Sequence, residues 1–452
     1  TQLVRRDGAR VTMRSVIFGA VVLLVGAWKA TATGMSLAEE GVNALGELDS
    51  SRAEDTSTLK RVVRLAEVGA KAPSVVSHRQ SKYDVDPDIG YRMPDIKLQS
   101  SKGIELDELN AFVPSWRYQT QYAPGERAYT DAYEATVLEI PNAYAYTFGD
   151  DFVVLDEENV YNVGGCGEKM EGWSLSVDAT DGSEIWDVPK QTISGRHRIK
   201  MLAVLVHRFS SSYFHWMTEA MPRLMLYLDI LGDEDQAMVK YLVPKNSYVR
   251  ESLRLFGIQE FRQAVFYDPS SVYVAEKVIV AAGTPCGRAP KTVLNEVKDR
   301  LYKILFPRPP KAVKNPGVVI LLKRNLSRQI SNFDEVVEVI RGGLKTSQQL
   351  VLFDDSKKHS VISQYMMFKN ADMVIGVHGG GLVNIMWSAK TTRVVEILPV
   401  TDSASGRRTR VCYASIAGSL GLDYTMIPVE SVNFDSPVEV PVEDLSKVLS
   451  MS

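Results

Sequence analysis

The chain has 452 residues, 45% of them hydrophobic and 24% charged, and this ordinary balance excludes a disordered or collagen-like protein. The formal net charge of −3 excludes the strongly basic character of many nucleic-acid-binding proteins, so we expect no nucleic-acid partner. Single hydrophobic cores stop growing at roughly 250 to 300 residues, so we expect more than one domain. The three cysteines, Cys166, Cys286 and Cys412, are too far apart for a cysteine-rich zinc site, and they allow at most one disulfide.

The amino-terminal residues carry the pattern of a secretory targeting segment. An apolar run at 16–28 follows four arginines, and its length fits the roughly 7 to 15 residues of a cleaved signal better than the about 20 of a bilayer span. Residues 30–32 offer a cleavage site, whereas an uncleaved anchor would place Arg14 and Lys29 at the membrane surface. We therefore predict that 1–35 is a signal peptide or a signal anchor. The remaining chain would lie in the lumen of the Golgi or endoplasmic reticulum, as a single-pass type II membrane protein if the segment stays uncleaved.

Residues 36–122 are polar and rich in charged side chains, which indicates a stem or a loosely folded lead-in. This segment contains Asp84 and Asp86 in a D-x-D pattern, with which many sugar-nucleotide enzymes hold a divalent cation. Prolines and charges surround the pattern and no apolar strand precedes it, so we interpret it as a chance occurrence. We expect no bound metal.

Two α/β regions, 123–306 and 318–452, follow the stem, and prolines concentrated in 307–317 predict a linker between them. Strands and helices alternate regularly in the second region, which indicates a parallel sheet covered on both faces. The expected strands are 201–206, 277–282, 318–322, 350–353, 373–377 and 394–398, and the expected helices are 216–231, 333–340 and 360–369.

A glycine-rich turn follows the expected strand 373–377 and lies where open α/β sheets bind ligands. It consists of His378, Gly379, Gly380, Gly381 and Leu382. A helix that starts at Leu382 would point free N–H groups and its positive dipole end at an anion such as a diphosphate, and His378 can donate a further hydrogen bond. The dinucleotide fingerprint G-x-G-x-x-G is not met, because His378 occupies its second glycine position, which argues against a nicotinamide enzyme.

A second cluster, at 323–332, follows the expected strand 318–322 and should emerge at the same edge of the sheet. It contains Arg324 and Arg328, and the planar guanidinium group suits phosphate oxygens. In isolation such a cluster is usually a solvated basic loop. Its expected convergence with the turn at His378 indicates a phosphate site instead.

A third cluster, at 213–224, lies on the expected helix of the first α/β region. His215 and Glu219 are four residues apart and share one helix face, so they can act together on one proton. The alternative is a half-buried His215 with its hydrogen bonds satisfied and a plain i,i+4 ion pair between Glu219 and Arg223, with an energy of about 0.3–0.5 kcal/mol. The aromatic residues around them favour a cleft that these aromatic side chains line.

Together these segments resemble glycosyltransferase family 61, over residues 207–399. That family includes plant xylosyl- and arabinosyltransferases and animal N-acetylglucosaminyltransferases that modify EGF domains or O-mannosyl glycans. One departure is Gly380, where the family usually has alanine. The matching residues are the segment 214–224, Arg324, Arg328, Asn332, Glu335, Ser363, Gln364, Ala371, Asp372, His378, Gly379, Gly381, Leu382, Asn384 and Glu396.

The resemblance implies a secretory-pathway enzyme of the GT-B fold, with two facing Rossmann-like domains. It implies transfer of xylose, arabinose or N-acetylglucosamine from a UDP-sugar to a glycan or glycoprotein acceptor, with inversion of the anomeric centre. Residues 318–452 would hold the nucleotide, and 123–306 would contribute the acceptor site. Glu219 would be the catalytic base, and His215 would orient it or serve as the base instead.

On the donor side, the diphosphate would lie over 378–382 and be clamped by Arg324 and Arg328. Glu396 would accept the ribose hydroxyls, and structural burial at a strand end is the alternative for this residue. Helix dipole and arginines can neutralise the diphosphate, so no metal or other cofactor would be required. The alternative is a lumenal pseudoenzyme that binds carbohydrate or nucleotide sugar without turnover.

Overall fold

The computed structural model describes residues 59–64, 77–80, 97–100, 136–148, 151–156, 159–162, 174–177, 184–187, 195–281, 287, 291–308, 317–403, 406–408 and 412–450. All of them belong to one compact unit, Thr56–Ser452. The predicted targeting segment 1–35, the aspartates Asp84 and Asp86, and most of the predicted linker lie outside the described residues. Across the described ranges, no helix is long and apolar enough to cross a membrane.

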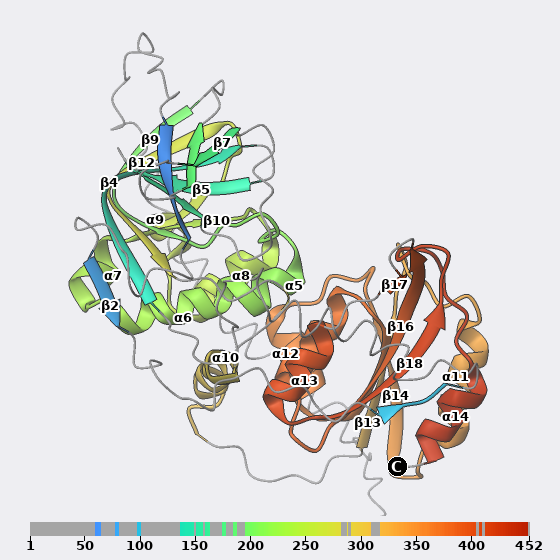
Figure 1. Cartoon of the computed structure of the whole chain (residues 1–452). Coiled ribbons are helices and arrows are strands. Elements are labelled where there is room, and N and C mark those ends of the chain that lie inside the picture. The colour runs from blue at the N-terminus through green and yellow to red at the C-terminus, as the bar shows by residue number, and fades with distance from the viewer. Residues whose placement is uncertain are drawn as a thin grey trace, which may run out of the picture. The chain divides into compact units, whose positions relative to one another are not determined.

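The first sheet of the described residues combines a parallel half with a half that is antiparallel except for the parallel pair of β6 and β1 (Figure 1). Its order is β11-β10-β9-β12-β4-β5-β6-β1-β8-β7, with β2 paired to β4. The parallel half runs from β11 to β12, and β4 joins β12 in antiparallel orientation. The strands are β1 (Leu59–Arg64), β2 (Ser77–Gln80), β4 (Thr136–Phe148), β5 (Asp151–Leu155), β6 (Asn159–Asn162), β7 (Ser174–Val177), β8 (Glu184–Asp187), β9 (Gly195–Val204), β10 (Lys240–Val243), β11 (Ala264–Phe266) and β12 (Ser271–Ala281).

Alternate residues of β9 supply the two cores on either face of this sheet. Met201 and Ala203 belong to the core that the helices cover, whereas Leu202 and Val204 belong to a second core on the opposite face. This is the period of two that a strand buried on both faces requires. The helices of this part are α5 (Tyr213–His215), a π-helical turn (Trp216–Ala220), α6 (Met221–Ile230), α7 (Asp233–Met238), α8 (Ser247–Leu255), α9 (Glu260–Gln263) and α10 (Lys291–Leu305).

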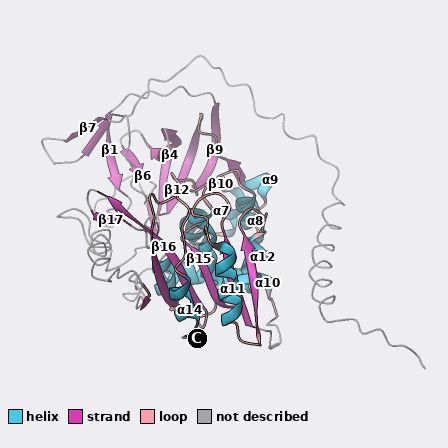
Figure 2. Ribbon diagram, turned by 90° about the vertical axis from the view of Figure 1, so that its right-hand side faces the viewer, coloured by secondary structure: helices cyan, strands magenta, loops and turns pink. Residues whose placement is uncertain are grey.

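The second sheet is parallel along its main path, in the order β14-β13-β15-β16-β18-β3. Helices α11 and α14 share a core with one of its faces, and α12, α13 and a 3-10 helix share a core with the other (Figures 1 and 2). The strands are β3 (Lys97–Leu98), β13 (Gly317–Lys323), β14 (Gln348–Asp354), β15 (Ala371–Val377), β16 (Arg393–Ser403), β17 (Gly406–Arg408) and β18 (Asp423–Glu430). The helices are α11 (Phe333–Gly343), α12 (Val361–Lys369), the 3-10 helix (Gly380–Trp387), α13 (Cys412–Leu420) and α14 (Val442–Ser450).

These elements confirm the predicted α/β class with parallel strands, and each expected strand and helix of 318–452 has a counterpart. The segment predicted as a stem, however, contributes β1 and β2 to the first sheet and β3 to the second. These strands are short and paired with residues far away in sequence, so local hydrophobic periodicity does not reveal them.

Each sheet reverses its strand order at one place. In the first, the chain moves outward from β9 to β10 and β11 and then returns to the other side of β9 with β12. In the second, it moves from β13 to β14 and then returns to the other side of β13 with β15. Open α/β sheets bind ligands at the carboxyl ends of the strands that flank such a reversal. We therefore expect a ligand site at the carboxyl ends of β9 and β12, or at those of β13 and β15.

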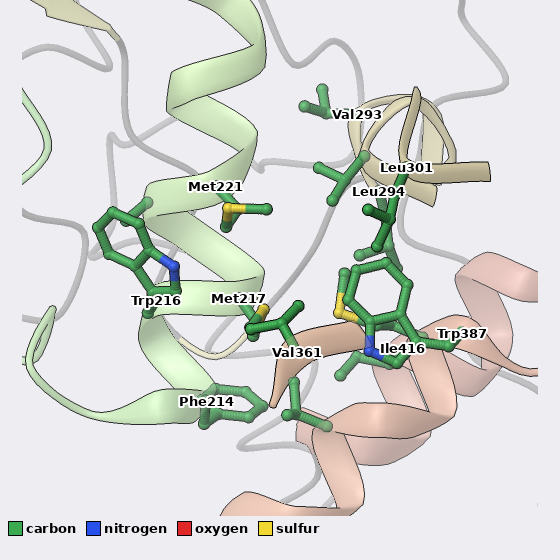
Figure 3. Packing of buried hydrophobic residues seen from close by; sticks show 14 of the residues in the cluster. Phe214, Trp216, Met217, Met221, Val293, Leu294, Leu301, Val361, Trp387 and Ile416 are labelled. Carbon is green, nitrogen blue, oxygen red and sulfur yellow. The ribbon is translucent and has the colours of Figure 1, made fainter. Parts of the chain in front are cut away.

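One hydrophobic core joins the helices of both sheets (Figure 3). Trp216 and Met221, from the segment after β9, belong to the same buried cluster as Leu294 of α10 and Trp387 of the 3-10 helix. The Lys298 ammonium of α10 also donates to the carbonyl oxygen of Ser388. Helix α10 thus packs against α6 on one side and against α13 and the 3-10 helix on the other.

Candidate active site

Glu219 lies at the centre of a buried polar group beside the first sheet. Its side chain is fully buried, and its Oε1 atom lies 2.6 Å from His215 Nδ1. The backbone N–H of Gly287 donates to the same oxygen at 3.1 Å. His207 Nε2 lies 3.5 Å from the other carboxylate oxygen. Because His207 follows β9 and Gly287 follows β12, this group forms at the strand reversal of the first sheet.

The carboxylate is carried by a π-helical turn, Trp216–Ala220, rather than by the regular helix that the sequence predicted. A π turn inserts one extra residue into a helix and is frequent at functional sites. Thr218 Oγ1 donates to the Phe214 carbonyl at 2.9 Å, and the Trp216 indole donates to Ser252 Oγ at 3.1 Å. These bonds hold the turn, so the predicted pairing of His215 with Glu219 is formed in a fixed geometry.

His207 is a site residue that the sequence prediction did not single out. It is buried, and burial lowers the pKa of its imidazole well below the ordinary value, with further lowering from the positive charge of Arg223 and from His215. The ring is therefore neutral at physiological pH, and one of its nitrogens can accept a proton. Its position immediately after a buried strand at a strand reversal is the signal that could have identified it.

Arg223 is fully buried, and among the residues that the structure describes none donates or accepts a hydrogen bond with its guanidinium nitrogens. The alternative interpretation, a plain i,i+4 ion pair between Glu219 and Arg223, is wrong, because no ion pair joins these two buried side chains among the described residues. A buried guanidinium without a partner is unfavourable by several kcal/mol. Its charge acts on His207 beside it.

The glycine-rich turn at the end of β15 lies against Arg324. A Cβ atom on Gly379 would overlap the guanidinium group of Arg324, so only glycine lets that group lie across the backbone. A Cβ on Gly381 would come within 2.8 Å of Leu322 Cδ2, whereas one on Gly380 would meet nothing within 4 Å. The alanine that family 61 usually has at the position of Gly380 would therefore fit here.

The helix after this turn begins earlier than predicted. It is a 3-10 helix that starts at Gly380, and the N–H of Leu382 donates to the Gly379 carbonyl at 2.9 Å. Leu382 is also fully buried, so neither its N–H nor its side chain is placed to meet an anion. Within this turn, the N–H groups that a helix start leaves without an intrahelical partner belong to Gly380 and Gly381.

The two predicted arginines differ in their surroundings. Arg324 donates from Nε to the Ser327 carbonyl at 2.8 Å and from a terminal nitrogen to Ser327 Oγ at 3.1 Å. Arg328 adopts a φ of 55°, in the left-handed region that non-glycine residues rarely enter. Its guanidinium carbon lies 4.9 Å from the ring centre of Phe434, and a terminal nitrogen lies 3.6 Å from Asp435. Both side chains border the reversal point between β13 and β15.

Glu396 does not have the ribose-binding position that was predicted for it. It is fully buried on β16, where Oε1 lies 2.5 Å from His378 Nδ1 and Oε2 accepts the phenol hydrogen of Tyr424. Both carboxylate oxygens are thus engaged within the fold. Burial and the Glu396 charge raise the pKa of Tyr424 well above its ordinary value, so the phenol stays protonated. Glu396 orients the His378 ring instead, with Nε2 directed away from β16.

The groups of the two sheets meet through Gly287 and the start of α13. Gly287 binds Glu219 and has a φ of 70°, which favours glycine. A Cβ built on it would lie 3.6 Å from Cys412 Cβ, and Cys412 Sγ lies 3.7 Å from His378 Nε2. Tyr413 adds a second connection, with ring centres 5.4 Å from Phe214 and 4.8 Å from His378.

A direct hydrogen bond further joins the two predicted segments. The Tyr213 hydroxyl donates to Asn384 Oδ1 at 2.9 Å. On α8, Glu251 accepts the backbone N–H of Val361 at 2.9 Å and so caps the start of α12. The three clusters that the sequence predicted are therefore brought together in one region. Within the ranges that the structure describes, no group of three or more His, Cys, Asp or Glu side chains could hold a metal ion.

An α/β protein in which buried acids, histidines and arginines lie near two strand reversals is a candidate for group transfer. The family model described as Glycosyltransferase 61 matches residues 213–395, which contain the π turn, the arginine loop and the glycine-rich turn. The resemblance to glycosyltransferase family 61 is thereby confirmed, and the match supports a transferase.

No curated protein matches the chain. Two mutant forms of a flavo di-iron protein from Thermotoga maritima are among the similar solved structures. One is 10% identical over 79% of this chain and 72% of that chain, with a TM-score of 0.22. The other is 9% identical over 78% and 71%, with a TM-score of 0.20. At these TM-scores the similarity carries no conclusion about fold or function.

Proposed function

We propose that this protein is an inverting glycosyltransferase that moves a sugar of the xylose, arabinose or N-acetylglucosamine class from a UDP-sugar to a glycan or glycoprotein. The observation that carries the proposal is the junction at Gly287. This residue binds the carboxylate of Glu219 and lies beside Cys412, which contacts His378. This junction supports a shared site for one acceptor and one donor, with Glu219 as the proposed base and the glycine-rich turn as the proposed phosphate-binding element.

On the donor side, the diphosphate would lie against the backbone N–H groups of Gly380 and Gly381. Arg324 would approach across Gly379, and its charge would stabilise the UDP leaving group as the glycosidic bond breaks. His378 would face the phosphates with Nε2, because Glu396 holds its other nitrogen. Arg328, at the same edge, would add a second positive charge. These charges support transfer without a metal ion.

On the acceptor side, Glu219 would remove the proton of the attacking hydroxyl. Its burial keeps water away, and its contacts with His215 and Gly287 fix the direction of the carboxylate. His215, which is partly exposed, would contact the acceptor or serve as the base instead. A single in-line displacement would invert the anomeric centre.

The proposal includes a GT-B architecture with two facing Rossmann-like domains. Support comes from the two strand reversals, each of which carries part of the candidate site. We further propose that the protein works in the Golgi or endoplasmic reticulum lumen as a type II membrane protein, on the basis of the amino-terminal sequence pattern.

The test is a thermal-shift panel of UDP-sugars on the purified lumenal part, followed by a UDP-release assay with acceptor glycans. A donor present at 100 times its Kd should stabilise the protein by about 2.7 kcal/mol. Release of UDP that depends on the acceptor would support transfer. Binding of UDP-sugar without release with any acceptor would favour the pseudoenzyme alternative, and binding of NAD in place of UDP would overturn the proposal.

A further inference from the structure

Phe209 is an exposed aromatic residue close to the proposed base. It lies in the turn that follows β9, at the carboxyl end of a strand that flanks the reversal of the first sheet. The residue is 40% exposed, whereas phenylalanine is among the residues most often buried. A single exposed apolar residue is ordinary on a protein surface, but this one lies at the edge where open α/β sheets bind ligands. Its position makes Phe209 a candidate ligand contact.

Hydrogen bonds hold the turn that carries Phe209. Ser210 Oγ donates to the His207 carbonyl at 2.9 Å and accepts from the His207 N–H at 3.2 Å. The Ser212 N–H donates to the Phe209 carbonyl at 2.8 Å. His207 itself lies 3.5 Å from Glu219, measured from Nε2 to the carboxylate. The exposed ring is therefore attached to the same backbone as the buried polar group.

The ring of Phe209 lies against His215, which contacts the proposed base. The two ring centres are 5.1 Å apart, and the planes are inclined by 32°. His215 Nδ1 lies 2.6 Å from Glu219 Oε1. Phe214, which is buried, packs its ring at 88° to His215 with a centre-to-centre distance of 5.0 Å. Phe209 and His215 thus form a ring surface, the stacking surface, that is one contact away from Glu219.

The surroundings of Phe209 match the two kinds of surface on a sugar. The guanidinium carbon of Arg208 lies 5.4 Å from the Phe209 ring centre, and Ser211 and Ser212 are exposed in the same turn. A sugar ring carries C–H bonds on its faces and hydroxyls around its edge. An aromatic ring covers such a face by dispersion and by removing apolar surface from water, and polar neighbours can bind the hydroxyls. A serine or threonine side chain offers no comparable flat face.

We propose that Phe209 is a specificity-determining residue for the acceptor, and that the acceptor hydroxyl belongs to a sugar ring rather than to a serine or threonine side chain. The sugar would lie with a C–H face on the stacking surface and with its attacking hydroxyl towards Glu219. Phe209 takes no part in proton transfer and acts by binding and orienting the acceptor. This role in catalysis rests on the proposed function, whereas the binding of a sugar on Phe209 does not.

The first experiment compares acceptor-dependent UDP release by F209A and by the native protein. The acceptors are the methyl β-glycosides of xylose, galactose and N-acetylglucosamine and methyl α-mannoside, with a serine- and threonine-containing peptide as the competing class. We expect F209A to raise KM for the glycoside by about 5- to 150-fold, the range for a stacking aromatic replaced by alanine beneath a nucleic-acid base. The value of kcat should change much less, because the lost contact is made before and during transfer alike. The Kd for the UDP-sugar should stay unchanged.

Three further variants separate a flat ring from apolar bulk and from general surface effects. F209Y keeps the ring and should leave KM close to the native value, whereas F209L keeps apolar volume without a flat face and should raise it. The matched control is F261A on α9, next to the outer strand β11. Phe261 is 84% exposed and also has an arginine neighbour, since the guanidinium carbon of Arg262 lies 5.7 Å from its ring centre. F261A should leave KM unchanged.

Saturation-transfer NMR provides a measurement that needs no turnover. The aromatic protons of the native protein are irradiated in the presence of each methyl glycoside, and the saturation that reaches the sugar protons is recorded. We expect the strongest transfer to the C–H protons of one ring face, a loss of this transfer in F209A and no change in F261A. Melting temperatures identify a variant that has not folded, and if F209A fails to fold, the comparison of F209Y with F209L replaces it.

The outcomes distinguish this proposal from the proposed function. A KM that F209A leaves unchanged, or that F209L preserves as well as F209Y does, would overturn the role of Phe209 while transfer itself stands. UDP release with the peptide and with none of the glycosides would also overturn it. If no acceptor releases UDP, the proposed transfer fails and the NMR measurement decides alone. Saturation that depends on Phe209 would then support sugar binding at this residue, and absent saturation, or saturation equal in F209A, would overturn it.

Discussion

The backbone N–H of Gly287 donates to Glu219 Oε1 at 3.1 Å, although the two residues are 68 positions apart in the sequence. The bond connects the end of one central strand of the first sheet to the π turn that follows another. It fixes the carboxylate that we propose as the base without adding a side chain to the space around it. A backbone donor can hold the orientation of a catalytic group and leave room for a substrate.

Replacement of Glu219 by glutamine tests its role as the base. E219Q keeps the shape of the side chain but cannot accept a proton, so we expect acceptor-dependent UDP release to fall by about 10²–10⁴-fold. Binding of the UDP-sugar should change little, because Glu219 lies beside the first sheet. A UDP-release assay measures transfer, and the thermal shift measures binding of the UDP-sugar. Undiminished transfer would exclude Glu219 as the base, and lost UDP binding would move it into the donor site.

Replacement of Arg324 by alanine tests the phosphate clamp. Charge-assisted hydrogen bonds contribute about 1.5–3 kcal/mol, so R324A should raise the Kd for UDP by about 10- to 150-fold. Isothermal titration with UDP measures this change directly. The matched control is R341A on α11, an exposed arginine paired with Glu338, which should leave the Kd unchanged. Equal affinities for R324A and the native protein would remove Arg324 from the donor site.

Two neighbouring glycines should respond differently to the same substitution. A Cβ at Gly379 overlaps the Arg324 guanidinium, whereas a Cβ at Gly380 meets open space. G379A should therefore displace Arg324 and weaken UDP binding, while G380A should fold and bind as the native protein does. Titration of both variants with UDP makes the comparison. A greater loss of UDP affinity in G380A than in G379A would contradict the described geometry of the turn.

The pH dependence of stability reports on His207. Burial keeps the folded-state pKa of this imidazole well below the unfolded value of 6.5, so below that pH the unfolded chain binds a proton that the folded protein does not. The contribution of His207 to the free energy of unfolding is fully present above about pH 6.5. It falls by up to about 1.4 kcal/mol per pH unit on acidification. Melting temperatures between pH 5 and 8 should decline less steeply in H207Q. If the melting temperatures of H207Q and of the native protein change equally with pH, His207 is not buried in its neutral form.

Removal of the Arg223 charge should make the protein more stable. The guanidinium is fully buried and has no hydrogen bond to the part of the chain that the structure describes, and methionine fills a similar volume without a charge. By analogy with buried ion pairs replaced by apolar side chains, R223M should raise the free energy of unfolding by about 1–4 kcal/mol. Thermal unfolding measures the difference, and R341M on the exposed surface of α11 should have little effect. A lower melting temperature for R223M would mean that its charge is compensated within the fold.

The strands and helices between residues 318 and 398 were predictable from sequence because they are apolar runs bounded by polar turns, whereas β18, α13 and α14 were not predicted. The three functional clusters were also predictable, since each contains chemically distinctive residues directly after a strand or on a helix. Hydrophobic periodicity does not reveal pairings between distant segments, so β1, β2 and β3 were missed. The π turn was missed because its sequence is compatible with a regular helix.

Two site residues show a second limit of prediction. Glu396 follows the pattern of a ligand-binding acid, but its role depends on Tyr424 and His378, which occupy its oxygens. Gly287 carries no side chain and acts through its backbone, so no residue pattern marks it. Both roles follow from contacts between segments far apart in the chain, and these contacts exist only in the folded structure.

The two-residue strand β3 has a consequence for how the chain is made. It pairs with β18, and Lys97 contacts Asp423 across 326 positions of sequence. At synthesis rates of about 5–20 residues per second, the residues of β3 leave the ribosome roughly 16 to 65 seconds before their partners. During that interval the whole first sheet can form, while β3 has no strand of the second sheet to pair with. The second sheet is therefore completed only when the last part of the chain has been made, and fragments beginning after residue 100 would lack β3.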